Sequence, residues 1–287
     1  MNYSALIQNR KSVREFSDRY VSFDAIEQIK TYYNHHVRRL LPEVETELRM
    51  FGLDARAVLE GAAGYKQFLV GSPQYMVLLS ANAPLAGENA GYIMEDLILK
   101  LTEMGLDSCW MTFTDSEYVK TALEIDSPLD VAAIAAFGYG VKTTKRLRLN
   151  ALSMSKIDIS AQRQYFAPKK GVSDLVFLDS WGNRNGVEEF IGFYDDMLWE
   201  AFYAASLSPS YLNRQPYGFV LRDGRVYLVQ IPDEHTDEID GQLDLGIVLL
   251  HFSAVAEKWA GKVDWRFEDV GALVLPEGYK AIASAAL

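Results

Sequence analysis

The segment RKSVREF, residues 10–16, brings three cations and one hydroxyl together near the start of the chain. The side chains concerned are Arg10, Lys11, Ser12 and Arg14. Guanidinium groups bind phosphate oxygens through bidentate, charge-assisted hydrogen bonds, and a neighbouring hydroxyl can add another. The segment therefore indicates a phosphate subsite, and the alternative is a solvated basic patch at the end of a helix.

A second segment, SLSPSYLNRQPYGFVL at residues 206–221, combines prolines with polar side chains. The polar side chains are Ser208, Ser210, Asn213 and Gln215. Such groups donate and accept hydrogen bonds at several heights, and Pro209 and Pro216 stiffen the loop that carries them. This pattern suits the edge of a planar polar ring, and the alternative is an ordinary loop between a helix and a strand.

A third group of cations follows the glycines of FGYG at residues 137–140. Its members are Lys142, Lys145, Arg146 and Arg148. If this stretch meets the first cluster in space, the two form a phosphate site inside an acidic protein. The alternative is a solvated exit from a strand.

The remaining polar residues give weaker signals. His35, His36, His235 and His251 have no metal-site spacing, and we expect His251 to be a satisfied core residue. Cys109, between Ser108 and Trp110, is expected to be buried and inert. The sequence has no glycine-rich dinucleotide motif and no P-loop, and no catalytic or metal-binding residue can be named.

Composition limits the class of protein. The 287 residues are 49% hydrophobic and 23% charged, as in a soluble globular protein. The net charge of −11 argues against nucleic-acid binding. A single cysteine excludes an internal disulfide, and we see neither a signal peptide nor an apolar run of about 18 residues. We therefore expect a cytoplasmic protein without a membrane span.

Hydrophobic periodicity predicts the elements that must position these segments in the first half. Helices are predicted at residues 22–33, with Ser22 as N-cap, and at 91–104, ending at Gly105. Residues 74–80 and 130–140 read as core strands. Residues 37–60 are charged and helix-prone.

The second half repeats a similar plan. We predict a helix at 189–205, a hairpin turning at Asp223-Gly224 and a helix at 244–259. The first of these helices should carry its apolar side chains on one stripe, made of Phe190, Phe193, Met197 and Ala201. The predicted domains are residues 1–150, an irregular connector at 151–188 and residues 189–287.

Two sequence shifts suggest that the halves are related. A shift of 155 places residues 91–110 on 246–265 without a gap, and pairs Gly91 with Gly246. A shift of 143 places the strand at 72–79 on 215–222 and pairs Pro73 with Pro216. We therefore predict a duplicated α+β unit, although any α+β protein yields a few such coincidences.

Four segments together resemble the FMN-dependent nitroreductase superfamily. RKSVREF is similar to its N-terminal Arg-Arg-Ser-x-Arg-x-Phe signature, with Lys11 at the second arginine. SPSYLNRQPY resembles its Pro-Ser-Ser-x-x-Asn-x-Gln-Pro-Trp loop, with Tyr211 at the second serine and Tyr217 at the aromatic. EDLILKLTEMGLDSCWM and FGYGVKTTKRLR resemble its helix-Gly-Leu-Gly-x-x-Trp segment and its closing strand.

The order of these motifs differs from that of single-unit members, which are homodimers with two FMN sites at their interface. Here the Pro-Ser loop lies in the second half, as in a doubled, putative nitroreductase subfamily. The resemblance implies a nitroreductase-like fold: an internally duplicated pseudo-dimer with antiparallel-rich sheets flanked by helices, and a monomer in solution. It also implies one complete flavin site per chain, with the symmetry-related site degenerate.

The resemblance also assigns roles to residues. Arg10, Lys11, Ser12 and Arg14 would hold the FMN phosphate and ribityl chain, assisted by Lys145, Arg146 or Arg148. Ser208, Pro209, Ser210, Asn213 and Gln215 would border the flavin from the other half. Thr112 would present its backbone N–H to the flavin N5 edge.

The implied activity is ping-pong reduction of a nitroaromatic, quinone or related small acceptor, with NAD(P)H as electron donor. Three alternatives stay open. The chain could be a different enzyme on the same fold, such as a flavin-fragmenting or dehalogenating one. It could be a non-catalytic protein that binds a flavin or another small ligand, or an unrelated α+β protein.

Overall fold

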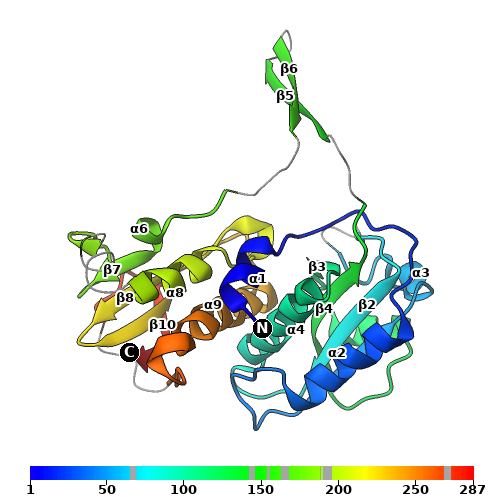
Figure 1. Cartoon of the computed structure of the whole chain (residues 1–287), viewed down its shortest axis with the longest axis horizontal. Coiled ribbons are helices and arrows are strands. Elements are labelled where there is room, and N and C mark those ends of the chain that lie inside the picture. Colours follow the sequence, from blue (N-terminus) through cyan, green and yellow to red (C-terminus); the bar gives the residue numbers. More distant parts are fainter. Residues whose placement is uncertain are drawn as a thin grey trace.

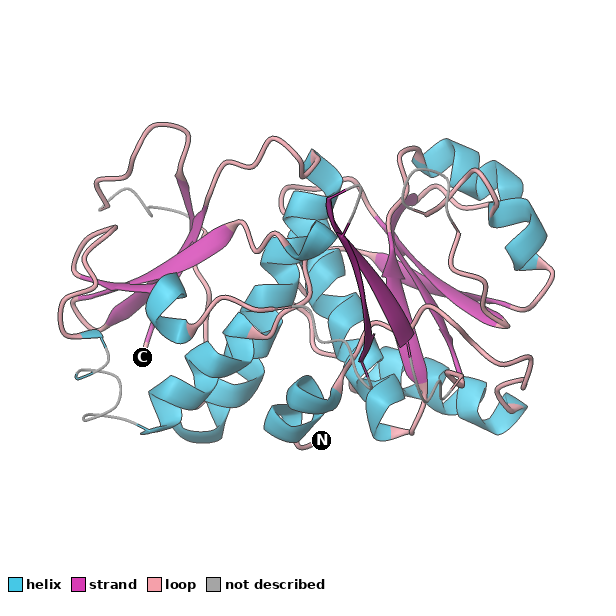
Figure 2. Cartoon of the chain, turned by 90° about the horizontal axis from the view of Figure 1, so that it is seen from above, coloured by secondary structure: helices cyan, strands magenta, loops and turns pink. Residues whose placement is uncertain are grey.

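The computed structural model describes residues 1–64, 69–141, 146–153, 156–162, 168–187, 189, 196–267 and 273–287. For residues 146–162 and 196 it describes the backbone alone. The chain has the expected α+β fold, and it forms two halves that lie side by side (Figure 1). Seen from above, a sheet lies towards each end of the molecule and helices pack between the two sheets (Figure 2).

The N-terminal half is built around the antiparallel sheet β1-β2-β4-β3. Its elements are α1 (Tyr3–Asn9), α2 (Phe23–His35), β1 (Thr46–Phe51), α3 (Ala55–Leu59), β2 (Gln74–Ser80), α4 (Ala86–Glu103), β3 (Asp107–Met111), α5 (Ser116–Ala122) and β4 (Asp130–Gly138). The predicted helices, the predicted strands and the Ser22 N-cap are confirmed, because the Ser22 side chain accepts a hydrogen bond from the Ala25 amide.

The C-terminal half is built around the sheet β10-β9-β8-β7. Its elements are α6 (Val172–Leu175), β7 (Val176–Leu178), α8 (Asp196–Ser206), the 3₁₀ turn η1 (Tyr211–Asn213), β8 (Tyr217–Arg222), β9 (Arg225–Gln230), α9 (Glu238–Ala260) and β10 (Lys280–Ala286). Asp223 and Gly224 have φ of 51° and 70°, as the predicted tight hairpin turn requires.

Both faces of the first sheet are buried, which explains why β2 is a continuous apolar run. Tyr75, Val77 and Leu79 point to the core under α3 and α5, whereas Met76 and Leu78 point to the core under α2 and α4. Because side chains alternate along a strand, a strand that is buried on both faces must be apolar at every position.

Helices α4 and α9 cross in the centre of the molecule, where each has a glycine. A Cβ on Gly91 would lie 2.3 Å from the Leu243 carbonyl oxygen, and a Cβ on Gly246 would lie 1.9 Å from the Glu88 carbonyl oxygen. Shifting Gly91 and Glu88 by 155 gives Gly246 and Leu243, so the two contacts are reciprocal. The crossing therefore has an approximate two-fold relation, and it is close enough that only glycine fits.

The order of elements supports the same relation. In each half a helix leads through a loop into two antiparallel strands and then into the crossing helix, as α2-β1-β2-α4 and as α8-β8-β9-α9. After the crossing helix, the Met111–Ile134 pair of β3 and β4 has its counterpart in the bridge between Arg266 and Ser284. The fold is thus an internal pseudo-dimer.

Four sequence expectations are wrong. The 143-residue shift pairs β2 with β8, but β2 corresponds to β9, because these two strands precede the crossing helices. Residues 37–60 contain the strand β1, whose side chains are only partly buried at the sheet edge, so charged residues are tolerated there. Helical structure in that range is limited to α3.

The connector is the third correction. It contains the hairpin of β5 (Arg146–Ser153) and β6 (Lys156–Gln162), then α6, and then β7, which pairs in parallel with β8. The fourth concerns α8, where Met197 is 48% exposed although Ala201 is fully buried. Phe190 and Phe193 lie outside the described residues. The predicted domain boundaries stay a prediction.

Helix α9 is long and apolar enough to span a membrane by length and composition, but 89% of its apolar window is buried inside the fold. Its neighbours include α1, α4 and α8. A helix that is apolar all round and buried by neighbouring elements is typical of a protein core.

Candidate functional site

Arg10 lies where α1 ends, and its side chain enters the interior between the halves. Helix α1 packs against α4, α8 and α9, and this leaves the Arg10 side chain only 7% exposed. Its Nε lies 3.4 Å from Oε1 of the buried Glu95. Nη1 is buried and has no hydrogen-bond partner among the described residues. A buried guanidinium with an unpartnered nitrogen is suited to an anionic ligand.

The chain after Arg10 runs beside the ends of β3 and β4. Ser12 pairs with Ser108, and the Val13 amide donates to the Ser108 carbonyl oxygen at 2.8 Å. Arg14 is exposed, but its positive charge, like that of Arg10, acts on Cys109. Burial is the larger effect there, so the pKa of the Cys109 thiol is raised and the predicted inert role fits.

Lys11 lies in the same segment and is exposed. The segment therefore offers one buried cation, Arg10, and two exposed ones, Lys11 and Arg14. The sequence could not separate them, because all three lie within two residues of Ser12.

The Pro-Ser loop reaches this region through Lys169, a residue of the connector. Lys169 Nζ donates to the Ser208 carbonyl oxygen at 2.7 Å. Burial, and after it the positive charge of Arg10, lower the pKa of Lys169 to about 8. Lys169 thus touches the Pro-Ser loop and interacts electrostatically with Arg10, which links the two segments, while their joint role in one site stays a prediction.

The side chains of Gln215 and Ser210 stabilise the conformation of the loop. The side-chain Nε2 of Gln215 donates to the Ser206 carbonyl oxygen at 2.7 Å, and its Oε1 accepts from the backbone amide of Lys170 at 2.9 Å. The backbone amide of Gln215 donates to Ser210 Oγ at 2.9 Å. Ser208 and Pro209 are buried beside these contacts. These residues therefore shape the loop, and Gln215 in particular has its side chain committed.

Asn213 is different. Its Nδ2 donates to the Pro168 carbonyl oxygen at 2.7 Å, but its Oδ1 is buried and has no partner among the described residues. Its φ of 58°, with 48° at Leu212 and at Gln215, places three of four successive non-glycine residues of the loop in or near the left-handed region. Such strain persists only when the surroundings impose it, and it is frequent at binding sites.

Asp244 of α9 binds the backbone of the Pro-Ser loop. Its two carboxylate oxygens accept from the Tyr211 amide at 3.0 and 3.1 Å. Burial raises the pKa of Asp244 well above its ordinary value, and the Tyr211 hydrogen bond opposes that shift. Asp244 thus adds less negative charge beside Lys169 than a solvated aspartate would.

Thr112 lies just beyond β3, and its hydroxyl donates to Asp240 Oδ2 at 2.8 Å. The bond joins the two halves, because Asp240 belongs to the first turn of α9. Burial raises the pKa of Asp240 to about 6, against the effect of the Thr112 hydrogen bond.

In the third cluster, Lys142 and Lys145 lie outside the described residues, and Arg146 and Arg148 are described by their backbone alone, on β5. Figure 1 shows the β5–β6 hairpin projecting away from the body of the protein. Their predicted contact with a phosphate stays a prediction. Lys169 is a further cation near Arg10. The sequence offered only the basic pair in APKKGVSD as a signal for it.

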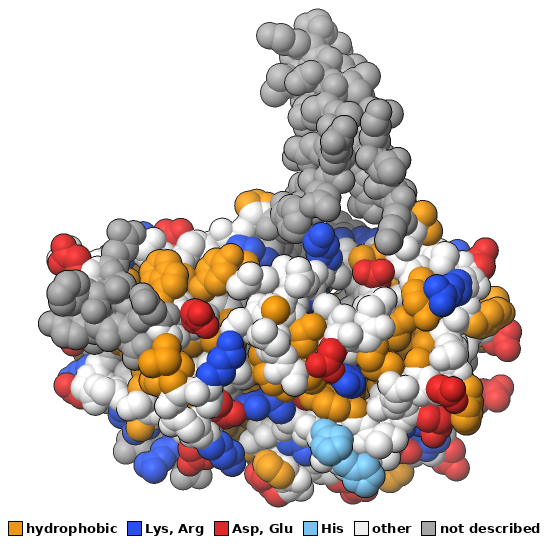
Figure 3. Space-filling view, in the orientation of Figure 1, with side chains coloured by type: hydrophobic (Ala, Val, Ile, Leu, Met, Phe, Trp, Pro, Cys, Tyr) orange, Lys and Arg blue, Asp and Glu red, His pale blue; other side chains and the backbone are white. Residues whose placement is uncertain are grey.

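The space-filling view shows Lys and Arg side chains at the base of this hairpin, in the middle of the face (Figure 3). Among the described residues, no group of three or more His, Cys, Asp or Glu side chains could hold a metal ion.

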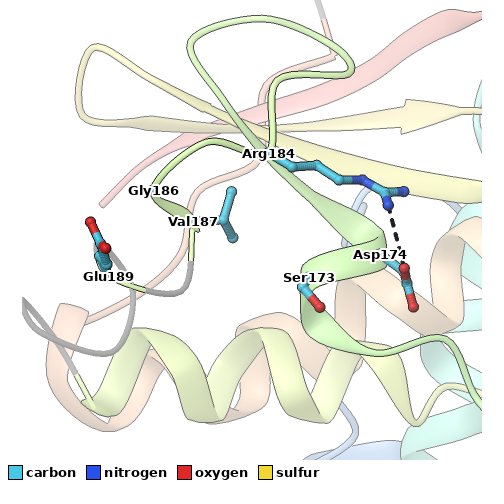
Figure 4. A pocket seen from close by; sticks show the side chains of 6 residues that line it. All are labelled: Ser173, Asp174, Arg184, Gly186, Val187 and Glu189. Carbon is cyan, nitrogen blue, oxygen red and sulfur yellow. Dashed lines mark ion pairs between the residues drawn. The ribbon is translucent and has the colours of Figure 1, made fainter.

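Two cavities lie elsewhere. One, of about 340 Å³, lies in the C-terminal half and is lined by Ser173, Asp174, Arg184, Gly186, Val187 and Glu189 (Figure 4). An ion pair of 3.5 Å between Arg184 and Asp174 crosses its rim. The other, of about 630 Å³, lies between the halves and is lined by Leu41, Glu43, Val44, Ala83, Pro84, Leu85, Arg266 and Phe267. Neither cavity shares a lining residue with the Arg10 region.

Comparison with known proteins gives a family and a fold. The profile of a family described as "Putative TM nitroreductase" matches residues 2–256. The structure of a putative nitroreductase from Thermotoga maritima is similar over 100% of this chain and 94% of its own, with 19% identity and a TM-score of 0.59. At that identity the likeness concerns the fold.

Two further structures are similar to parts of the chain. An FMN-dependent nitroreductase from Clostridium difficile R20291 covers 47% of this chain and 86% of its own, with 18% identity and a TM-score of 0.40. A nitroreductase family protein from Clostridium novyi covers 49% and 87%, with 18% identity and a TM-score of 0.43. No curated protein matches the chain.

Proposed function

The chain belongs to the nitroreductase family whose profile spans residues 2–256, and we propose that it is an FMN-dependent oxidoreductase with one flavin site between its halves. The observation that supports the proposal most directly is a group of buried polar atoms without partners among the described residues of that region, on Arg10, Ser208 and Asn213. Arg10 Nη1 offers a donor to an anion, and Asn213 Oδ1 offers an acceptor to an N–H or O–H group.

The residues of the region fit FMN by their chemistry. Arg10 and Lys169 would hold the phosphate, and the hydroxyl of Ser12 and the exposed Lys11 and Arg14 lie on the same segment as Arg10. The Asn213 carboxamide would face the polar edge of the ring system. Thr112 would approach the ring through its backbone, because its hydroxyl is already used by Asp240.

When bound, FMN accepts a hydride and passes electrons to a second substrate. The chain itself needs no acid or base for this step, and its residues bind, orient and exclude water. We propose NAD(P)H as electron donor and a nitroaromatic, quinone or related small molecule as acceptor. The proposal extends to a monomer that works in the cytoplasm.

A visible spectrum tests the proposal. The purified protein, supplied with FMN, should become yellow and should bleach when NADPH or NADH is added without oxygen. Yellow protein that does not bleach with either donor would support a flavin-binding protein without this activity. Protein that stays colourless with added FMN would exclude the flavin site.

A further inference from the structure

Glu95 is a fully buried carboxylate in the middle of α4, and three N–H-bearing side chains lie around its two oxygens. Its Oε2 accepts from Trp110 Nε1 at 2.7 Å. Its Oε1 lies 3.0 Å from His251 Nε2 and 3.4 Å from Arg10 Nε. A carboxylate with no solvent exposure must be compensated in this way, since burying an unpaired charge costs several kcal/mol.

The surroundings of His251 fix its protons. Its Nδ1 lies 3.1 Å from the carbonyl oxygen of Ala204, and a carbonyl oxygen only accepts, so Nδ1 carries a proton. The other nitrogen faces Glu95. Turning the ring by 180° would place the carbons Cδ2 and Cε1 against these two oxygens, so the two contacts fix the orientation of the ring.

The proton between His251 and Glu95 can lie on either partner. Burial raises the pKa of Glu95, but the charge of Arg10 and the hydrogen bonds from His251 and Trp110 outweigh it and hold the pKa below the ordinary value. The 3.0 Å contact between Nε2 and Oε1 needs one proton between the two atoms, so the ring carries a proton at Nδ1 and shares a second with Glu95.

The arrangement leaves Nη1 at the end of Arg10 without a partner among the described residues. Trp110 and His251 each take one oxygen of Glu95, and Arg10 approaches Oε1 with Nε alone, at a distance longer than a good hydrogen bond. Without His251, Oε1 would lack a donor, and the Arg10 guanidinium could turn to pair with the carboxylate through two nitrogens. Nη1 would then no longer be available.

We propose that Glu95 and His251 are positioning residues that orient Arg10 towards the phosphate group of the ligand. The inference rests on the flavin function proposed above. Two cations, Arg10 and Lys169, act electrostatically on Glu95, and burial raises the pKa of Asp244, the other carboxylate beside Lys169, so the region favours an anion. The pair thereby selects a phosphorylated flavin over the same ring system without phosphate.

The protonation of His251 can be measured without any flavin. In the protein labelled with ¹⁵N-histidine, both ring nitrogens of His251 should show the chemical shifts of protonated nitrogen at neutral pH. A lone-pair shift for Nε2 would overturn the inference. Replacing His251 by glutamine identifies the resonance.

The positioning role is tested by comparing FMN with riboflavin. The substitutions His251→Gln and Glu95→Gln should each weaken FMN binding about 10- to 100-fold, as expected for loss of a charge-assisted contact. Riboflavin binding should change less than about twofold. His235→Gln is the matched control, because that side chain is 55% exposed and its ion pair is with Glu234, outside the cluster.

The outcomes separate the two proposals. If the unmodified protein binds neither flavin, the proposed function fails, while the His251 spectrum still decides its protonation. If His251→Gln and Glu95→Gln weaken both flavins equally, the positioning role is wrong. If neither variant folds, the ¹⁵N spectrum of the unmodified protein decides.

Discussion

The two ends of the α4–α9 pair share one backbone plan but differ in chemistry. At one end Thr112 bonds to Asp240, and the 155-residue shift takes this pair to Phe267 and Leu85 at the other end. At the first end Asp244 accepts the amide of Tyr211 in the loop. Its counterpart Asn89 accepts the amides of Leu40 and Leu41.

The same scaffold thus supports a loop at both ends through one buried polar side chain of the crossing helix. Both ends have buried polar atoms without partners among the described residues, such as Asn213 Oδ1 at one and Asn89 Nδ2 at the other, but the buried cation Arg10 with Lys169 near it lies at the Arg10 end. The other end has a cavity of about 630 Å³ lined mostly by apolar side chains, with Glu43 opposite in charge to Arg266. The difference teaches that the fold supplies positions, and that the side chains decide whether a position can bind an anion.

The helix crossing that joins the ends should be the most sensitive point. Gly246→Ala would put a Cβ 1.9 Å from a backbone oxygen, and we expect it to lower the free energy of unfolding by more than about 3 kcal/mol. Gly241→Ala in the same helix is the control. There the nearest side-chain atom is 3.6 Å away, so alanine should stabilise the helix by about 1 kcal/mol. Equal effects in denaturant unfolding would refute the close crossing.

The next largest effect concerns the cations of the two ends. Arg10→Ala should weaken FMN binding about 100-fold, since it removes a buried, charge-assisted contact. Arg266→Ala, at the opposite end, should leave the affinity within about twofold. Fluorescence titration of FMN measures both, and comparable losses in the two variants would remove the distinction between the ends.

The free energy of unfolding should depend on pH through Asp240, whereas its counterpart Leu85 has no titratable group. The folded pKa of Asp240 is raised to about 6 by burial, against 3.8 for the free group. Between these values the folded chain binds more protons than the unfolded one, so stability falls as the pH rises from about 4 to about 6. Allowing for the partial exposure of Asp240, the loss is about 2 kcal/mol. Denaturant unfolding of Asp240→Asn between about pH 4 and 6 should not show this loss of stability. The same pH dependence in the variant and the unmodified protein would refute the assignment to Asp240.

The smallest effect is expected at Thr112. Thr112→Val keeps the shape but removes the hydrogen bond between the halves, and should cost about 1 kcal/mol. The exposed Thr121→Val on α5 is the matched control and should be close to neutral. A thermal melt of the two variants makes the comparison, which fails if their midpoints coincide.

Periodicity predicted the elements that are strongly patterned, such as α4, β2 and the β8–β9 hairpin. It missed β1, because an edge strand tolerates charged side chains, and β7, because its three residues pair only through tertiary structure. The cations of RKSVREF could be listed from the sequence. Which one is buried could not, since that depends on how α1 packs between the halves.

The supporting residues of the site were out of reach for a similar reason. Glu95 is an acidic residue in an apolar helix, and such a residue is usually on the surface. Its partners Trp110 and His251 come from β3 and α9, and only the folded chain brings them together. Lys169 belongs to a stretch that reads as a polar connector. An acidic residue within an otherwise apolar helical segment is the signal in the sequence that could have marked Glu95 in advance.

The stoichiometry of FMN binding tests the central claim most directly. Equilibrium titration of the whole chain should saturate at one FMN per chain, and Arg10→Ala should abolish that binding at micromolar FMN while Arg266→Ala retains it. Two FMN per chain, or a single FMN lost in Arg266→Ala and kept in Arg10→Ala, would contradict the assignment of the flavin to the Arg10 end.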